Sequence, residues 1–124
     1  NDVALICAGN MMSETLNAAN ILRENGISAE VVSFHTVKPL DESYLQSASA
    51  RFKLWITVEE HSRIGGFGSA VLEWRSFTNC DVQQIIVGTE DEFMHEVGSQ
   101  SYARKKYGLT AENIVARVTE SLKR

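Results

Sequence analysis

The chain has few of the residues and patterns that divide a protein or anchor it, and each shortage excludes a class of structure. Its 124 residues include one proline, and no proline- or serine-rich linker interrupts them. No apolar run approaches the roughly 20 residues of a membrane span, and the N-terminus shows no signal-peptide pattern. We therefore expect residues 1–124 to form one domain of a cytoplasmic protein with no membrane partner.

Positive charge is also scarce. Lys and Arg number 12 against 16 Asp and Glu, which gives a formal net charge of -4. A nucleic-acid-binding domain would show a basic stripe, whereas the densest basic cluster here is Arg104, Lys105 and Lys106. A solvated helix face explains that cluster, so we expect no nucleic-acid partner.

Cysteine and histidine are too few, and too widely spaced, to indicate a metal or redox centre. Cys7 and Cys80 lack the paired spacing of a zinc site or a redox motif, so we expect two reduced thiols in the core or in turns. His35, His61 and His95 are isolated from one another, with no H-x-x-x-H spacing and no neighbouring cysteine. The sequence therefore predicts no metal site.

Apolar residues are plentiful, at 44% of the chain, and their pattern alternates between two types of secondary structure. Short apolar or β-branched runs predict strands at 3–8, 29–34, 54–58 and 82–87. Segments with helical spacing lie between them. This alternation indicates βαβ units with right-handed crossovers, so we expect a three-layer α/β/α sandwich with a mostly parallel sheet.

The first helix is predicted after the first strand. Ser13 is the expected cap, with Glu14 in the first turn, where the helix dipole favours negative charge. Leu16, Ala19 and Leu22, backed by Ala18 and Ile21, form the expected inner stripe, and Gly26 ends the helix in a left-handed conformation.

Later helices are predicted from apolar residues at helical spacing, which are Leu45, Ala48 and Phe52, then Phe67, Val71 and Trp74, and finally Ile114, Val118 and Leu122. Asp41 and Thr110 are the expected caps of the first and last of these helices. A further short helix is expected over 99–107.

The stretch from Val58 to Val71 gathers most of the residues that could carry chemistry. It should run from the carboxyl end of the third strand into a helix, the edge where ligands gather in open α/β sheets. Its glycines match neither the phosphate loop nor the dinucleotide fingerprint. Two interpretations remain: the glycines let helix and sheet approach closely, or the helix start binds an anion.

Catalysis by this stretch lacks a complete set of groups. Glu59 and Glu60 are neighbours in a strand, so their side chains point to opposite faces and cannot meet at one substrate atom. One of them is expected to face solvent or to cap the glycine loop. His61 titrates in the right range for acid–base work but has no obvious nucleophile beside it, and no G-x-S-x-G motif occurs.

The order of several short motifs is more specific than any one of them. A-G-N precedes the first helix, T-V-K-P-L-D the second and V-E-E-H the run G-G-F-G-S-A-V, and Y-G-L-T-A-E-N-I leads into the last helix. Together these motifs cover essentially the whole chain, and the set resembles the C-terminal domain of the transketolase family. The E-E-H and glycine segments look closest to transketolase-like and 1-deoxyxylulose-5-phosphate synthase-like members, and less close to the beta subunits of 2-oxoacid dehydrogenases.

The resemblance implies an enzyme that uses thiamine diphosphate and a divalent cation, usually Mg²⁺, to move a two-carbon ketol unit between sugar phosphates. In such enzymes the N-terminal and middle domains hold the cofactors, and neither domain is in these residues. We therefore expect an inactive isolated domain, excised or split from a larger enzyme, that binds no cofactor alone. Its expected partners are the missing domains, in the same chain or a separate subunit, within a homodimer.

The resemblance supplies no catalytic, cofactor or metal residue in this chain. Instead we interpret one loop as a structural turn placed against a neighbouring domain or subunit, with a helix start that can still bind an anion. Its residues are Glu59, Glu60, His61, Arg63, Gly65, Gly66, Gly68 and Ser69.

Two alternatives remain from other functional classes. The chain could be a stand-alone module that holds a phosphorylated regulator at the helix starts after Gly9 and Gly65. It could instead be a pure assembly module, in which case an exposed apolar patch involving Phe67 or Trp74 is expected.

Overall fold

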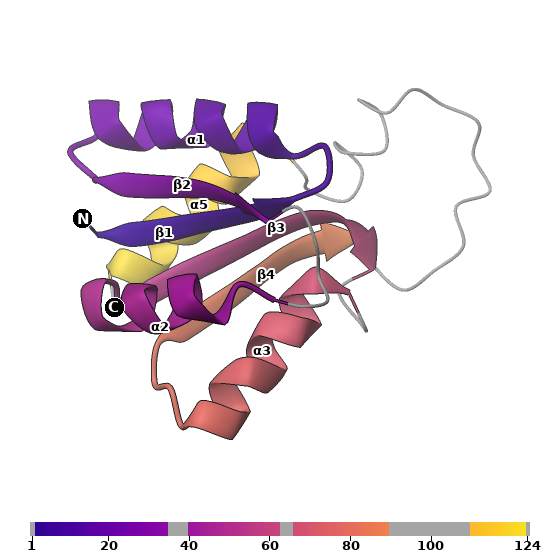
Figure 1. The fold of residues 1–124 in the computed structure, drawn as a ribbon. Helices are drawn as coiled ribbons and strands as arrows, with labels where there is room; N and C mark the ends of the chain where they lie inside the picture. The colour runs from indigo at the N-terminus through magenta and orange to yellow at the C-terminus, as the bar shows by residue number, and fades with distance from the viewer. Residues whose placement is uncertain (1, 35–39, 63–65, 90–109, 124) are drawn as a thin grey trace, which may run out of the picture.

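The structure is a computed structural model that describes residues 2–34, 40–62, 66–89 and 110–123. Four strands form one parallel sheet: β1 (Val3–Ala8), β2 (Ala29–Phe34), β3 (Leu54–Ser62) and β4 (Gln83–Thr89). Their order is β2-β1-β3-β4, so β1 and β3 are central (Figure 1). The parallel sheet confirms the predicted arrangement of the strands.

Helices cover both faces of the sheet. Two helices, α1 (Met12–Glu24) and α5 (Ala111–Leu122), pack on one face, and α2 (Glu42–Arg51) and α3 (Phe67–Thr78) pack on the other (Figure 1). All six residues of β1 are buried, as expected for a strand covered on both sides. The predicted α/β/α sandwich is confirmed.

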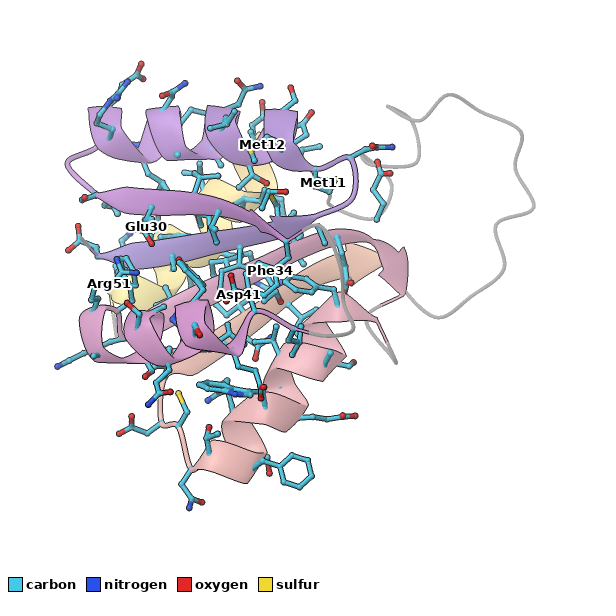
Figure 2. All side chains as sticks on the ribbon, in the orientation of Figure 1. Met11, Met12, Glu30, Phe34, Asp41 and Arg51 are labelled. Carbon is cyan, nitrogen blue, oxygen red and sulfur yellow. The ribbon has the colours of Figure 1, made fainter. Side chains whose placement is uncertain are left out.

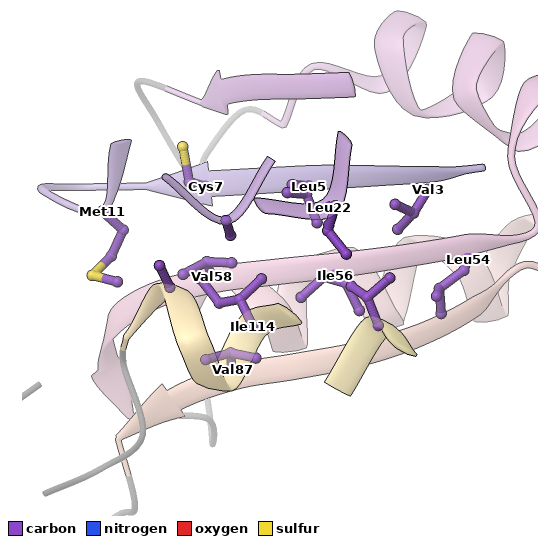
Figure 3. Close-up of a cluster of buried hydrophobic side chains, with 13 residues drawn as sticks. Val3, Leu5, Cys7, Met11, Leu22, Leu54, Ile56, Val58, Val87 and Ile114 are labelled. Atoms are coloured by element: carbon purple, nitrogen blue, oxygen red, sulfur yellow. The ribbon is translucent and has the colours of Figure 1, made fainter. Parts of the chain in front are cut away.

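Two apolar clusters fill the spaces between the layers. The first joins α1, α5 and one face of the sheet, and Figure 3 shows Leu22 and Ile114 among the strand residues of this cluster. The second joins α2, α3 and the opposite face, with Trp55 of β3 fully buried in it. Alternate residues of β1 and β3 therefore supply both clusters.

The boundaries of α1 differ from the prediction. The helix begins at Met12, so Ser13 is inside its first turn rather than at its cap. The N-cap position is Met11, whose side chain is fully buried in the core. The buried face consists of Thr15, Ala18 and Leu22, so the prediction of Leu16 as an inner residue is wrong. Leu16 is instead 47% exposed.

The predicted residues at the ends of the helices, other than Ser13, have the expected roles. The carboxylate of Asp41 accepts a hydrogen bond from the Tyr44 amide at 3.1 Å, and the Thr110 hydroxyl accepts one from the Asn113 amide at 3.3 Å. Gly26 has the predicted left-handed φ, at 81°.

The inner stripes of the later helices are confirmed except at one end. Leu45, Ala48, Ile114 and Val118 are fully buried, whereas Leu122 is the last residue of α5 and is 42% exposed, so its assignment to the core is wrong. The helix predicted over 99–107 falls outside the described residues.

Both cysteines are free, as expected. Cys7 is buried, and burial raises the pKa of its thiol, which disfavours the reactive thiolate. Cys80 is half-buried after α3. No helix in the part of the chain that the structure describes is long and apolar enough to cross a membrane.

Candidate interface loop at the start of α3

Glu59 connects the end of the sheet to the start of α3. Its side chain is fully buried, and its two carboxylate oxygens accept hydrogen bonds from the backbone N–H groups of Phe67 at 2.6 Å and Gly68 at 3.0 Å. These amides belong to the first turn of α3, where no intrahelical acceptor exists and the helix dipole favours negative charge. Glu59 therefore caps the glycine loop, which is one of the two roles that the sequence left open for this pair of glutamates.

Gly68 allows α3 to pack directly against the sheet. A Cβ atom at this position would lie 2.8 Å from Cγ2 of Ile86 and 2.9 Å from Oγ1 of Thr57, closer than real side-chain contacts. The side chain of Gln84 reinforces the same contact, because its Nε2 donates to the Gly68 carbonyl at 3.0 Å and to Thr57 Oγ1 at 3.2 Å. The interpretation of this glycine as a packing residue is confirmed.

The structure also shows where several other residues of the predicted loop lie. His61 lies in β3, which continues to Ser62 rather than ending at Val58 as predicted. Gly66 is the N-cap of α3 with extended backbone, and Ser69 is in its first turn. Glu60, next to Glu59, is half-buried.

Arg63 and Gly65 lie outside the described residues, as do His35 and His95. That the loop contacts a neighbouring domain or subunit remains a prediction.

A second carboxylate joins the start of α1 to the start of α5. Glu14, in the first turn of α1, accepts a hydrogen bond from the Ala111 amide at the start of α5, with 2.8 Å between donor and acceptor. Sequence reasoning placed Glu14 in a helix start but missed this partner. No local signal could have found it, because 97 positions separate the two residues.

Of the two apolar residues considered for an assembly surface, one is buried and the other is half-buried. Phe67 is 2% exposed and packs in the second core cluster, and Trp74 is half-buried against the same cluster. Among the residues described, no three His, Cys, Asp or Glu side chains are grouped so that they could hold a metal ion.

Comparisons with known proteins identify relatives of this chain by sequence and by fold. The family model described as the transketolase C-terminal domain matches residues 1–114. The chain is 43% identical to the 1-deoxy-D-xylulose-5-phosphate synthase of Desulforudis audaxviator, covering 100% of this chain and 19% of the synthase. It is 42% identical to the 6-deoxy-6-sulfo-D-fructose transketolase subunit SqwH of Clostridium sp., covering 99% of this chain and 38% of that subunit.

A solved structure described as a split gene transketolase, in an inactive beta4 tetramer, superimposes with a TM-score of 0.89. It is 37% identical, and the match covers 98% of this chain and 39% of that one. The chain thus spans less than two fifths of the length of each of these relatives. Family model, sequence identity and fold agree, and the chain belongs to the transketolase C-terminal domain family.

Proposed function

We propose that this chain is the C-terminal structural and dimer-assembly domain of a thiamine-diphosphate-dependent, transketolase-like enzyme. The complete enzyme would move a two-carbon ketol unit between sugar phosphates. The domains that hold thiamine diphosphate and Mg²⁺ would be its partners, in the same polypeptide or in a separate subunit, and the whole would form a homodimer in the cytoplasm.

The observation that carries the proposal is the pair of hydrogen bonds between Glu59 and the start of α3. In the loop with the densest polar chemistry, this carboxylate is fully buried and bonded to two amides of the domain's own helix. Amides at a helix start are a common binding site for a diphosphate, but here the side chain of Glu59 already accepts their hydrogen bonds. The start of α3 therefore does not fit the diphosphate, which supports a structural role for the loop.

The relatives support the assembly part of the proposal. Two of them are described as a transketolase subunit and as a split gene transketolase, and this chain matches less than two fifths of each. A domain with this fold within a larger catalytic assembly is the simplest arrangement consistent with those matches.

Reconstitution tests the proposal directly. The chain would be purified alone, and also with the thiamine-diphosphate-binding region from the same genome, and two-carbon transfer from a ketose phosphate to an aldose phosphate would be measured with Mg²⁺ present. We expect no transfer by the chain alone, and both a stable complex and transfer with the partner region. Transfer by the chain alone, or a partner region that is fully active and dimeric without it, would overturn the proposal.

A synthase is the second candidate, because a 1-deoxy-D-xylulose-5-phosphate synthase is among the relatives, at 43% identity. The reconstituted enzyme would then form 1-deoxyxylulose 5-phosphate rather than transfer a ketol unit between sugars. Product analysis of the same mixture separates the two reactions.

The stand-alone regulator-binding module predicts something different, namely saturable binding of a sugar phosphate to the chain alone. At the start of α3 such an anion would have to compete with the Glu59 carboxylate for the Phe67 and Gly68 amides. Calorimetric titration of the isolated chain with a sugar phosphate would test this alternative.

A further inference from the structure

A groove lies between α2 and α3, on the face of the sheet opposite α1 and α5. It has a volume of 570 Å³ and is lined by Glu42, Gln46, Ser49, Trp74, Thr78, Asn79, Cys80 and Asp81. Figure 1 shows the two helices that form its walls, on the same side of the sheet. None of the residues that line the groove belongs to the Glu59 loop, although Trp74 and Thr78 lie further along the same helix, α3.

One wall of the groove is aromatic and packs against the second core cluster. The Trp74 ring packs against Trp55 of β3, with 6.1 Å between ring centroids, and Trp55 is fully buried. Trp74 therefore needs little reordering when a partner contacts it, which limits the entropy cost of binding.

Phe77 extends this aromatic surface into solvent. It follows Trp74 by three positions in α3, so the two side chains lie on neighbouring parts of the helix surface. Phe77 is 87% exposed, more than any other large apolar side chain that the structure describes. An exposed aromatic residue beside a groove is typical of an interaction surface, since aromatic side chains supply much of the energy of protein interfaces.

The two charged residues that line the groove are both acidic, and two of the lining residues, Ser49 and Asp81, also border a neighbouring hollow that contains Arg51 and Lys53. Glu42, in the first turn of α2, and Asp81, after α3, are both exposed, and the lining contains no Lys, Arg or His. A partner that placed a carboxylate here would be repelled by both groups, whereas a cationic side chain would be attracted. Gln46, Ser49 and Thr78 add uncharged polar side chains that suit peptide backbone groups.

We propose that the groove between α2 and α3 binds a basic peptide segment of a partner polypeptide. An aromatic or aliphatic side chain of the segment would pack on Trp74 and Phe77, and a Lys or Arg would lie near Glu42 and Asp81. This proposal rests on the shape, apolar exposure and charge of the groove, and it does not depend on the reaction of the complete enzyme.

Selection from a library of random 12-residue peptides tests the proposal on the intact chain. We expect the retained peptides to combine Lys or Arg with a large apolar residue and to change the tryptophan fluorescence of the chain on binding, because Trp74 lines the groove. Their affinity should fall about tenfold for Phe77→Ser and about threefold for Glu42→Gln or Asp81→Asn, as expected for an aromatic anchor and for exposed charges. Raising the salt concentration should weaken binding to the parent chain more than to the charge variants.

Matched variants elsewhere separate a local effect from a general one. Leu16→Ser removes another exposed apolar side chain, and Glu112→Gln removes another exposed carboxylate from the first turn of a helix. Neither should change peptide affinity. Circular dichroism and urea unfolding should show that Phe77→Ser and Asp81→Asn remain folded, because both side chains are exposed.

Four results would overturn the proposal. The first is that no retained peptide depends on both Phe77 and the two carboxylates. The second is that acidic peptides bind as well as basic ones. The third is that free arginine amide binds as tightly as the best peptide, which would indicate a small-molecule site. The fourth is a dimer of the parent chain in sedimentation analysis that Phe77→Ser dissociates, because a second copy would then occupy this face.

Discussion

At the scale of single residues, Glu59 has the most demanding environment described. A carboxylate that is fully removed from water is tolerated only when its oxygens are well bonded, and here two helix amides provide those bonds. The residue therefore fixes the distance and angle between β3 and α3. A change at this position should therefore weaken the fold of the domain.

Glu59→Gln tests this dependence. Glutamine retains one acceptor oxygen but turns an NH₂ group toward the second backbone amide, which leaves that amide without an acceptor. We expect the free energy of unfolding to fall by about 1–3 kcal/mol, the usual cost of a buried polar group without a partner. Urea unfolding followed by circular dichroism measures it.

Glu73→Gln is the matched control for this experiment, because Glu73 is exposed on the same helix. Its effect should stay within about 0.5 kcal/mol, as for most surface substitutions. Equal stability of the two variants would show that the Glu59 bonds contribute nothing to the fold.

Gly68→Ala tests the close approach of α3 to the sheet. The new methyl group would meet Ile86 Cγ2 at 2.8 Å and Thr57 Oγ1 at 2.9 Å. We expect a loss of about 1–3 kcal/mol from overpacking. The measurement is again the urea midpoint, repeated in an Ile86→Ala background, where the cost of Gly68→Ala should be smaller because two of the crowding atoms are gone.

Gly26→Ala provides the comparison. Gly26 has a left-handed φ of 81° but open space where a Cβ would lie, so alanine there should cost about 1 kcal/mol through backbone strain alone. That cost should be the same with and without Ile86→Ala. Relief of both glycine variants by Ile86→Ala would contradict a local clash at Gly68.

At the scale of secondary-structure elements, one polar cluster joins β2 to α2. The Arg51 guanidinium donates to both carboxylate oxygens of Glu30, at 2.9 and 3.2 Å, and the Tyr44 hydroxyl donates to one of them at 2.7 Å. Figure 2 shows Glu30 on the strand facing Arg51 on the helix. The hydrogen bond from Arg51 lowers the pKa of Glu30, and burial together with Glu30 raises the pKa of Tyr44.

This cluster makes stability depend on acidity in a defined direction. Because the pKa of Glu30 is lower in the folded state than its ordinary value of 4.5, the cluster stabilises the fold above that pH. The contribution is lost as the pH falls through the lowered pKa of the folded state. Glu30→Gln should therefore be less stable than the parent at pH 7, with a difference that shrinks in acid.

The pH dependence of the urea midpoint measures the effect of the cluster. Glu112→Gln, at the exposed start of α5, should show no comparable convergence with the parent. A constant difference between Glu30→Gln and the parent from pH 7 down to pH 2 would contradict the assignment to this carboxylate.

Sequence reasoning succeeded where the deciding interaction is local. Asp41 and Thr110 cap helices because their side chains reach amides three positions away, a pattern that is visible in the sequence. Ser13 was misplaced because α1 begins at Met12, directly after the buried Met11. Leu16 was misplaced because the buried face of α1 follows Thr15, Ala18 and Leu22, which the spacing of apolar residues alone does not show. Leu122 was misplaced because an apolar stripe does not show where the underlying sheet ends.

The candidate site was predictable to the same limited degree. Strand alternation indicated that only one glutamate of the pair would point inward, but not that Glu59 would be fully buried. The bonds from Gln84 to Gly68 and from Ala111 to Glu14 join residues 16 and 97 positions apart. Such partners become visible only when the layers of the fold are assembled.

At the scale of the whole molecule, α5 covers the central part of the sheet. Ile114 and Val118 are fully buried in the cluster that also contains residues of β1, β3 and α1, and Glu14 bonds to the start of the same helix. The helix therefore contributes to the packing of elements from the beginning and the middle of the chain. Loss of its inner side chains should affect the entire fold.

Ile114→Ala and Leu122→Ala test this role with the same kind of truncation. Ile114 is fully buried, so its replacement should cost about 2–5 kcal/mol, whereas Leu122 is 42% exposed and should cost clearly less. Thermal unfolding should show one transition that moves to lower temperature for both variants, much further for Ile114→Ala. A larger decrease in transition temperature for Leu122→Ala than for Ile114→Ala would contradict the observed buried face of α5.

The position of β1 between β2 and β3 has a consequence for the order of folding. This strand precedes both of its neighbours in the sequence. It pairs with residues 29–34 on one side and with residues 55–58 on the other, and α5 covers one of its faces. The sheet can therefore form only when segments that are far apart in the sequence come together. Folds of this kind refold more slowly than helical bundles of similar length. During synthesis, β1 would leave the ribosome before β2, β3 and α5, and it would carry an uncovered apolar surface until α5 has emerged.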